Sequence, residues 1–274
     1  MLVPAEIGVA MLAQLELRAE ITLAKLSGRA RPLPWRQLVP VWTRPCDNWP
    51  TADLLRTVGI EADDIVRFET PFGQVCFSEA GQQFLSVLVL DQLRGVYDRF
   101  ESRLRPGDYV LDLGAHVGTF TRYALSKGAA KVIAVEPNPF HVKCLNHGFD
   151  SEIRAGKVEV VQAAAWDSRT RLHFHSEGVL SRVSDTGTSI VETVTVDALA
   201  ATLPRVDFIK ADIEGAERVA IRGAIKTLAT YRPRLALCTY HLPDDPLVIP
   251  REVKKANPAY HTRFNVSRCQ VYGA

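Results

Sequence analysis

The chain has 274 residues, of which 47% are hydrophobic and 23% are charged, and its formal net charge is +2. These values are ordinary for a globular protein, and so small a net charge gives no reason to expect nucleic acid or a strongly acidic partner. No apolar run reaches the length of a membrane span, and charged residues interrupt the apolar ones near the N-terminus, so we expect neither a span nor a signal peptide.

The cysteines are odd in number and scattered, and they contain no C-x-x-C pair. This usage favours reduced thiols in a cytoplasmic protein over a disulfide framework or a zinc site. The residues concerned are Cys46, Cys76, Cys144, Cys238 and Cys269.

The first elements in chain order are a helix and an irregular segment. Residues 5–26 place apolar side chains near one helical face and end at Ser27-Gly28, which predicts an amphipathic helix. We expect this helix to pack on its own domain. A subunit contact is the next alternative, so the helix could also form a homo-oligomer. Residues 29–50 contain five prolines, three tryptophans and four arginines, which predicts an ordered, irregular cover. These tryptophans and arginines suit either ordinary packing or contacts to a sugar or phosphate.

A hairpin and a helix are expected next. Residues 65–78 alternate apolar and polar side chains around Thr70-Pro71-Phe72-Gly73, a turn sequence. Residues 82–104 predict one long helix that Pro106-Gly107 stops. We therefore expect an N-terminal helical and hairpin extension over residues 1–81 and the main domain over residues 82–274.

The stretch from Asp108 to Phe120 organises the rest of the chain. An apolar run at 109–113 predicts a strand buried on both faces, with Asp112 inside it. Gly114 follows, where a glycine lets the backbone turn sharply and approach a ligand, and residues 119–126 then predict a helix. A strand, a glycine turn and a helix start are typical of nucleotide-like ligand sites. The spacing is D-x-G-x-x-x-G, with His116 in the turn, and lacks the third glycine of the dinucleotide-binding pattern G-x-G-x-x-G.

A second strand at 131–135 ends in Glu136. An acidic side chain at this position can accept hydrogen bonds from both ribose hydroxyls of a nucleoside. A helix is expected at 137–146 and a third strand at 158–162, followed by small residues that leave space for a flat adenine ring. Those small residues are Ala163, Ala164 and Ala165.

The later elements complete an α/β pattern. Residues 172–175 and 190–196 predict an inserted hairpin, on which His173 and His175 share a face without a third metal ligand. A fourth strand at 206–211, a helix at 214–229 and a fifth strand at 233–239 follow. Residues 263–272 predict a closing antiparallel pair.

Four segments resemble the FkbM family of S-adenosylmethionine-dependent methyltransferases: YVLDLGAHVGTFT, VIAVEPNP, DFIKADIEGAE and CTYHLPDD. The resemblance implies a doubly wound, Rossmann-like class I methyltransferase sheet, on which the long helix at 82–104 lies over the cofactor. Many relatives carry Asn where this chain has His116. The residues expected to bind S-adenosylmethionine are Asp112, Gly114, Ala115, His116, Glu136, Pro137, Asn138, Ala164, Ala165 and Asp212.

The expected catalytic residues are Asp212, Glu214 and His241, which fall at the ends of neighbouring strands. Methyl transfer to oxygen needs an aligned acceptor, removal of its proton and exclusion of water. His241 is the preferred general base because histidine titrates near neutral pH, with Asp212 orienting it or the acceptor. The alternative makes the same residues ligands of a divalent metal, which is not favoured because imidazole prefers softer metals than Mg²⁺. Each residue also has a structural interpretation, such as helix capping by Asp212.

The sequence therefore predicts an S-adenosylmethionine-dependent O-methyltransferase acting on a small hydroxylated molecule. By resemblance, a sugar unit or a secondary-metabolite hydroxyl is the leading substrate class. Two other classes stay open: a nicotinamide-dependent oxidoreductase, and a non-catalytic cofactor-binding or assembly protein.

Overall fold

The computed structural model describes residues 55–60, 64–99, 101–175, 182–183, 187, 189–265 and 270–273. The helix expected at 5–26 and the irregular segment expected at 29–50 lie outside the described residues. Among the helices within these ranges, none is long and apolar enough to cross a membrane.

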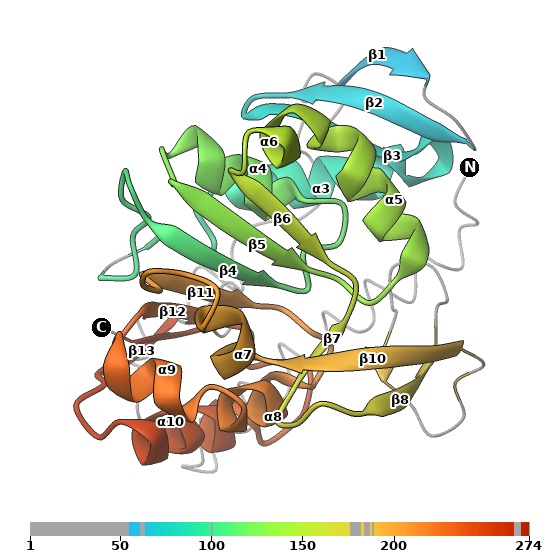
Figure 1. Ribbon diagram of the computed structural model, residues 1–274. Helices are drawn as coiled ribbons and strands as arrows, with labels where there is room; N and C mark the ends of the chain where they lie inside the picture. Colours follow the sequence, from blue (N-terminus) through green and yellow to red (C-terminus); the bar gives the residue numbers. More distant parts are fainter. Residues whose placement is uncertain are drawn as a thin grey trace.

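A seven-stranded sheet with the order β13-β14-β12-β11-β4-β5-β6 forms the centre of the molecule (Figure 1). Neighbouring strands from β12 to β6 run parallel, whereas β14 and β13 close the other edge as an antiparallel pair. This confirms the predicted doubly wound α/β sheet. The strands are β4 (Tyr109–Leu113), β5 (Lys131–Val135), β6 (Val158–Val161), β11 (Phe208–Ala211), β12 (Arg234–Leu237), β13 (Thr262–Asn265) and β14 (Gln270–Gly273).

Helices cover both faces of this sheet because successive strand residues point to opposite sides. Leu111 and Ile209 pack in one cluster with α7 to α10, while Val110 and Phe208 pack in another with α4. Figure 1 shows α4, α5 and α6 on one side and α7 to α10 on the other. These helices are α4 (Thr119–Ser126), α5 (Pro139–Gly148), α6 (Asp150–Arg154), α7 (Val196–Ala200), α8 (Glu217–Arg222), α9 (Ile225–Thr230) and α10 (Asp245–Ala256).

The single helix expected at 214–229 is wrong, because α8 and α9 are separate helices. The break falls at Gly223, whose carbonyl accepts a hydrogen bond from the Asp197 N–H. A Cβ on Gly223 would lie 2.2 Å from the Trp166 carbonyl oxygen, so only glycine lets the chain pack against the backbone at Trp166.

The expected hairpin is present as β2 (Ile65–Thr70) and β3 (Gly73–Ser78), and β1 (Arg56–Ile60) adds a third antiparallel strand. A short 3₁₀ helix, η1 (Glu79–Gly81), leads from β3 into α3 (Gln82–Leu93). Phe68 and Phe77 of this small sheet share a hydrophobic cluster with Leu85 of α3 and Cys144 of α5. The small sheet thus packs directly on the main domain.

Helix α3 ends at Leu93, well before the predicted end at residue 104. Gly95 has φ +60° and its N–H donates to the Gln92 carbonyl, while the Val96 N–H donates to the Asp91 carbonyl. This pattern is a Schellman motif, which ends a helix at a left-handed glycine. The chain therefore turns at Gly95, and the helix does not continue toward β4.

A second sheet lies beyond the carboxyl ends of β6 and β11 and has the order β7-β10-β8-β9. The expected hairpin is confirmed as the antiparallel pair β8 (Arg171–His175) and β10 (Ser189–Thr195). Strands β7 (Ala164–Trp166) and β9 (Arg182–Val183) complete the sheet. His173 Nδ1 lies 3.1 Å from the Gly187 carbonyl oxygen, a structural contact.

Candidate active site

A cleft opens at the carboxyl edge of the parallel strands and encloses about 600 Å³, including its open mouth. The position is where ligands bind in open α/β sheets. The expected site residues that line it are Gly114, His116, Glu136, Pro137, Ala164, Ala165, Asp212 and Glu214. Asp112, Ala115, Asn138 and His241 do not line it directly.

The turn after β4 requires glycine for its backbone conformation, as expected, and also for the space that it leaves to a neighbouring strand end. Gly114 has φ +75°, and a Cβ there would lie 2.0 Å from the carbonyl oxygen of Asp212. The close approach is therefore made by the neighbouring strand end. The Gly114 and Ala115 N–H groups both donate to the Val135 carbonyl, which ties the turn to β5.

A buried ion pair supports this turn from below. Lys210 Nζ lies 3.1 Å from Asp112 Oδ1 and donates to the Gly114 carbonyl at 2.6 Å. Thr121 donates to the other Asp112 oxygen at 2.7 Å. Burial alone would lower the pKa of Lys210, but Asp112 and Asp212 outweigh it and raise the pKa above its ordinary value. Asp112, expected among the cofactor-binding residues, braces the turn through Lys210 and Thr121.

Glu136 lies at the end of β5, lines the cleft and is 5% exposed. Its Oε2 accepts from the His116 N–H and its Oε1 from the Asn138 N–H, both at 2.9 Å. Oε1 also faces His141 Nδ1 at 3.4 Å, whereas Oε2 keeps a second lone pair that can accept a ligand hydroxyl. Asn138 is the N-cap of α5, because its side chain accepts from the Phe140 N–H.

His116 carries two buried ring nitrogens that have no hydrogen-bond partner. Its ring lies edge-on to Phe77 and Phe84 and 4.0 Å from the ring of His141, measured between centroids. Burial, reinforced by His141 and Lys210, holds the pKa of His116 well below its usual value. A neutral imidazole with unsatisfied nitrogens at a cleft wall is suited to a polar group of a bound ligand.

The far wall of the cleft is apolar. Ala164 and Ala165 begin β7, and Phe174 of β8 lies beside them with 1% of its surface exposed. This wall of the cleft therefore presents small side chains beside one aromatic residue.

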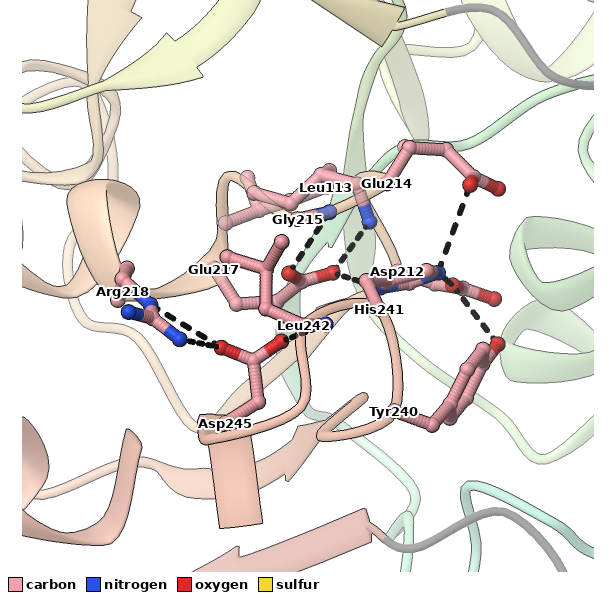
Figure 2. A network of polar contacts seen from close by, with 12 residues as sticks. Leu113, Asp212, Glu214, Gly215, Glu217, Arg218, Tyr240, His241, Leu242 and Asp245 are labelled. Atoms are coloured by element: carbon pink, nitrogen blue, oxygen red, sulfur yellow. Dashed lines mark hydrogen bonds and ion pairs between the residues drawn. The ribbon is translucent and has the colours of Figure 1, made fainter. Parts of the chain in front are cut away.

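Asp212, directly after β11, is held by two tyrosine hydroxyls. Tyr97 donates to Oδ2 at 2.6 Å and Tyr240 donates to Oδ1 at 3.1 Å. His241 Nε2 lies 3.4 Å from Oδ1 and 3.6 Å from Glu214 Oε2 (Figure 2). Glu214 has φ +54°, and its side chain is 35% exposed, the most open carboxylate of the group.

Glu217 completes the cluster from the first turn of α8. The carboxylate is fully buried and accepts from the Ile213 and Gly215 N–H groups at 2.8 and 3.1 Å. His241 Nδ1 lies 2.9 Å from Glu217 Oε1. Burial alone would lower the pKa of His241, but Glu217, with Asp212 and Glu214, raises it to about 9. At neutral pH the ring is therefore an imidazolium between carboxylates, which is contrary to its expected role as a base.

The loop carrying His241 is fixed from the side of α10. Buried Asp245 accepts from the Leu242 N–H at 2.8 Å and pairs with Arg218 of α8 (Figure 2). Glu217 of α8 thus contacts the imidazole itself, and the start of α10 holds the loop that carries it.

Ligand atoms of Asp212, Glu217 and His241 lie within 4.8 Å of one another, close enough to be considered for a metal. The two imidazole nitrogens already face the two carboxylates, so the charged ring itself occupies the space between them. This geometry fits a carboxylate–imidazolium–carboxylate array.

The roles of three site residues were not predicted from the sequence. They are Tyr97, Lys210 and Glu217. Tyr97 belongs to the region expected to be helical, and no local pattern connects it with Asp212. Glu217 lies in the first turn of an expected helix, where an acidic side chain is ordinary and gives no signal of a site. Lys210 did offer a signal, because a lysine inside a buried strand requires a partner charge.

Comparison with known proteins relates the chain to methyltransferases. A family model described as methyltransferase FkbM domain matches residues 112–254. The crystal structure of methyltransferase FkbM from Methylobacillus flagellatus KT is similar, with a TM-score of 0.53, 20% identity and coverage of 72% of this chain. This chain spans 56% of that relative's length. The likeness shows a shared fold.

A more distant likeness joins the chain to fibrillarin from Aeropyrum pernix, solved with natively bound S-adenosyl-L-methionine. Its TM-score is 0.41 at 12% identity, over 80% of this chain and 99% of that one. A comparison with curated proteins gives no significant match.

Proposed function

The chain belongs to the FkbM methyltransferase family, and on that premise we propose that it transfers a methyl group from S-adenosylmethionine to a hydroxyl of a small molecule. The observation that carries the proposal is one cleft with Glu136 at one end and the Asp212–Glu214 carboxylates at the other. A sugar unit or a secondary-metabolite hydroxyl is the proposed substrate class.

The residues of the Glu136 end fit the nucleoside part of S-adenosylmethionine. Glu136 keeps an acceptor lone pair on Oε2 for a ribose hydroxyl, and His116, whose ring nitrogens have no hydrogen-bond partner, lines the same cleft. Ala164 and Ala165 leave space for the adenine ring. When bound, the cofactor supplies an electrophilic methyl group on a sulfonium centre.

The acceptor end is built from Asp212, Glu214 and His241, which we propose as the catalytic residues. Asp212 is fixed by its tyrosine partners and can orient the acceptor hydroxyl by accepting its proton in a hydrogen bond. His241 holds its own proton at neutral pH, so we assign proton acceptance to a carboxylate. Glu214 is the most open of them, so we assign this role to Glu214.

Methyl transfer from labelled S-adenosylmethionine to a library of hydroxylated small molecules tests the proposal. We expect transfer to at least one sugar or secondary-metabolite hydroxyl, and a thermal shift with S-adenosylhomocysteine that NAD does not produce. A shift with NAD alone, or transfer only to nitrogen acceptors, would overturn it.

A further inference from the structure

Tyr97 connects a segment outside the matched family domain with the acceptor end of the cleft. It follows the Schellman turn at Gly95 and is 5% exposed. Its hydroxyl donates to Asp212 Oδ2 at 2.6 Å, across 115 residues of sequence. That distance is typical of a hydroxyl bound to a charged carboxylate, which is among the stronger hydrogen bonds in proteins.

The phenol ring is fixed by its surroundings. It lies edge-on to Phe120 with 5.5 Å between centroids, and Lys210 Nζ lies 5.6 Å from its centroid. Tyr97 cannot turn away without opening this cluster, so its hydroxyl has one position relative to Asp212.

Asp212 is thereby oriented by contacts on both oxygens. Tyr97 holds Oδ2, while Tyr240 donates to Oδ1 and the His241 ring faces the same oxygen at 3.4 Å. Because the contact from Tyr97 is the shorter of the two tyrosine bonds, its loss would release the carboxylate most. A carboxylate free to rotate would not hold an acceptor hydroxyl in line with a methyl donor.

We propose that Tyr97 is a positioning residue that fixes the orientation of Asp212, so that the loop after α3 completes the acceptor site of the methyltransferase domain. This inference rests on the proposed function. It assigns to a residue that precedes the matched range 112–254 a part in the rate of methyl transfer, exerted through Asp212.

The test compares Tyr97→Phe with Tyr123→Phe. Tyr123 is a matched control, because it is also 5% exposed, belongs to the same hydrophobic cluster and donates its hydroxyl at 2.7 Å to Asp98. We expect Tyr97→Phe to lower kcat by about 10- to 100-fold, with KM for S-adenosylmethionine within twofold. Tyr123→Phe should leave kcat unchanged, with a similar melting temperature for both variants.

A double variant separates positioning from packing. If Tyr97 acts through Asp212, adding Tyr97→Phe to Asp212→Asn should lower kcat no further than Asp212→Asn alone. Additive losses, or equal losses in Tyr97→Phe and Tyr123→Phe, would overturn the inference.

An NMR measurement tests the role of Tyr97 without any methyl-transfer assay, so it does not depend on the proposed function. The ¹³Cγ resonance of Asp212, assigned by its loss in Asp212→Asn, should shift in Tyr97→Phe and stay unchanged in Tyr123→Phe. An unshifted resonance in Tyr97→Phe would refute the inference. If the wild-type protein transfers no methyl group, the proposed function fails while this resonance still decides whether Tyr97 orients Asp212.

Discussion

Glu217 and His241 face one another at 2.9 Å, with the carboxylate fully buried and the imidazole 9% exposed. Two backbone N–H groups and the imidazolium together neutralise the buried carboxylate. If the ring lost its proton, Glu217 would keep a buried charge with only neutral donors, so the pair links the protonation of His241 to the stability of the fold.

The first prediction concerns the pH dependence of stability. The folded pKa of His241, about 9, lies above its unfolded value near 6.5. Its contribution to the free energy of unfolding is therefore complete below about pH 6.5 and is lost as pH rises through 9, in total roughly 2–4 kcal/mol. Denaturant titrations from pH 6 to 10 should show this loss in the wild type.

The control variants are His241→Gln, which should lack this slope, and exposed His261→Gln, which should keep it. The same pH dependence in the wild type and His241→Gln would contradict the prediction.

The second prediction concerns cofactor affinity. Glu136→Gln keeps the shape of the side chain and an oxygen acceptor but removes the charge. We expect S-adenosylhomocysteine binding to weaken by roughly 1.5–3 kcal/mol in isothermal calorimetry. Glu159→Gln, on β6 and paired with Lys131 away from the cleft, should bind as the wild type does. Unchanged affinity in Glu136→Gln would mean that the ribose lies elsewhere.

The third prediction concerns Gly114. Its φ of +75° is matched by the φ of +72° at Gly156, where a Cβ would meet nothing within 4 Å. Gly156→Ala should cost roughly 1–2 kcal/mol of unfolding free energy, from the backbone conformation alone. Gly114→Ala adds a collision with the Asp212 carbonyl, so it should cost clearly more and also abolish cofactor binding. Equal losses in denaturant titrations would contradict the geometry of the turn.

The fourth prediction concerns metal. Because the imidazolium of His241 already lies between Asp212 and Glu217, methyl transfer should survive EDTA. The measurement is the labelled-methyl assay before and after chelation. Activity that EDTA abolishes and Mg²⁺ restores would instead make these residues metal ligands.

Much of the fold could be predicted from local patterns. Buried runs such as 109–113 and the turn at Thr70–Gly73 specify a strand and a hairpin within a few residues. The helix ends were less predictable, because Gly95 and Gly223 each lie inside a mixed apolar and polar pattern that favours continuation of the helix. The division of the chain at residue 81 stays a proposal, although Phe77 and Leu85, on either side of it, share one cluster.

The candidate site was predictable only in part, because its residues come from distant segments. Strand ends gave Gly114, Glu136 and Asp212, since parallel strands bring their carboxyl ends to one edge. The direction of the His241 pKa could not be read from sequence, because it depends on Glu217 lying against the ring.

The pairing of Asp112 with Lys210 also decides how the two middle strands align. These residues are direct partners in the parallel register of β4 and β11, two strands far apart in the chain. A slip of one residue would turn one of the two side chains to the opposite face of the sheet and leave each charge buried without the other. Breaking such a buried pair costs about 3–5 kcal/mol. A misaligned sheet is therefore destabilised by the unpaired charges as well as by lost packing. The Asp112–Lys210 ion pair that holds the turn at Gly114 thus also favours the correct register of β4 and β11.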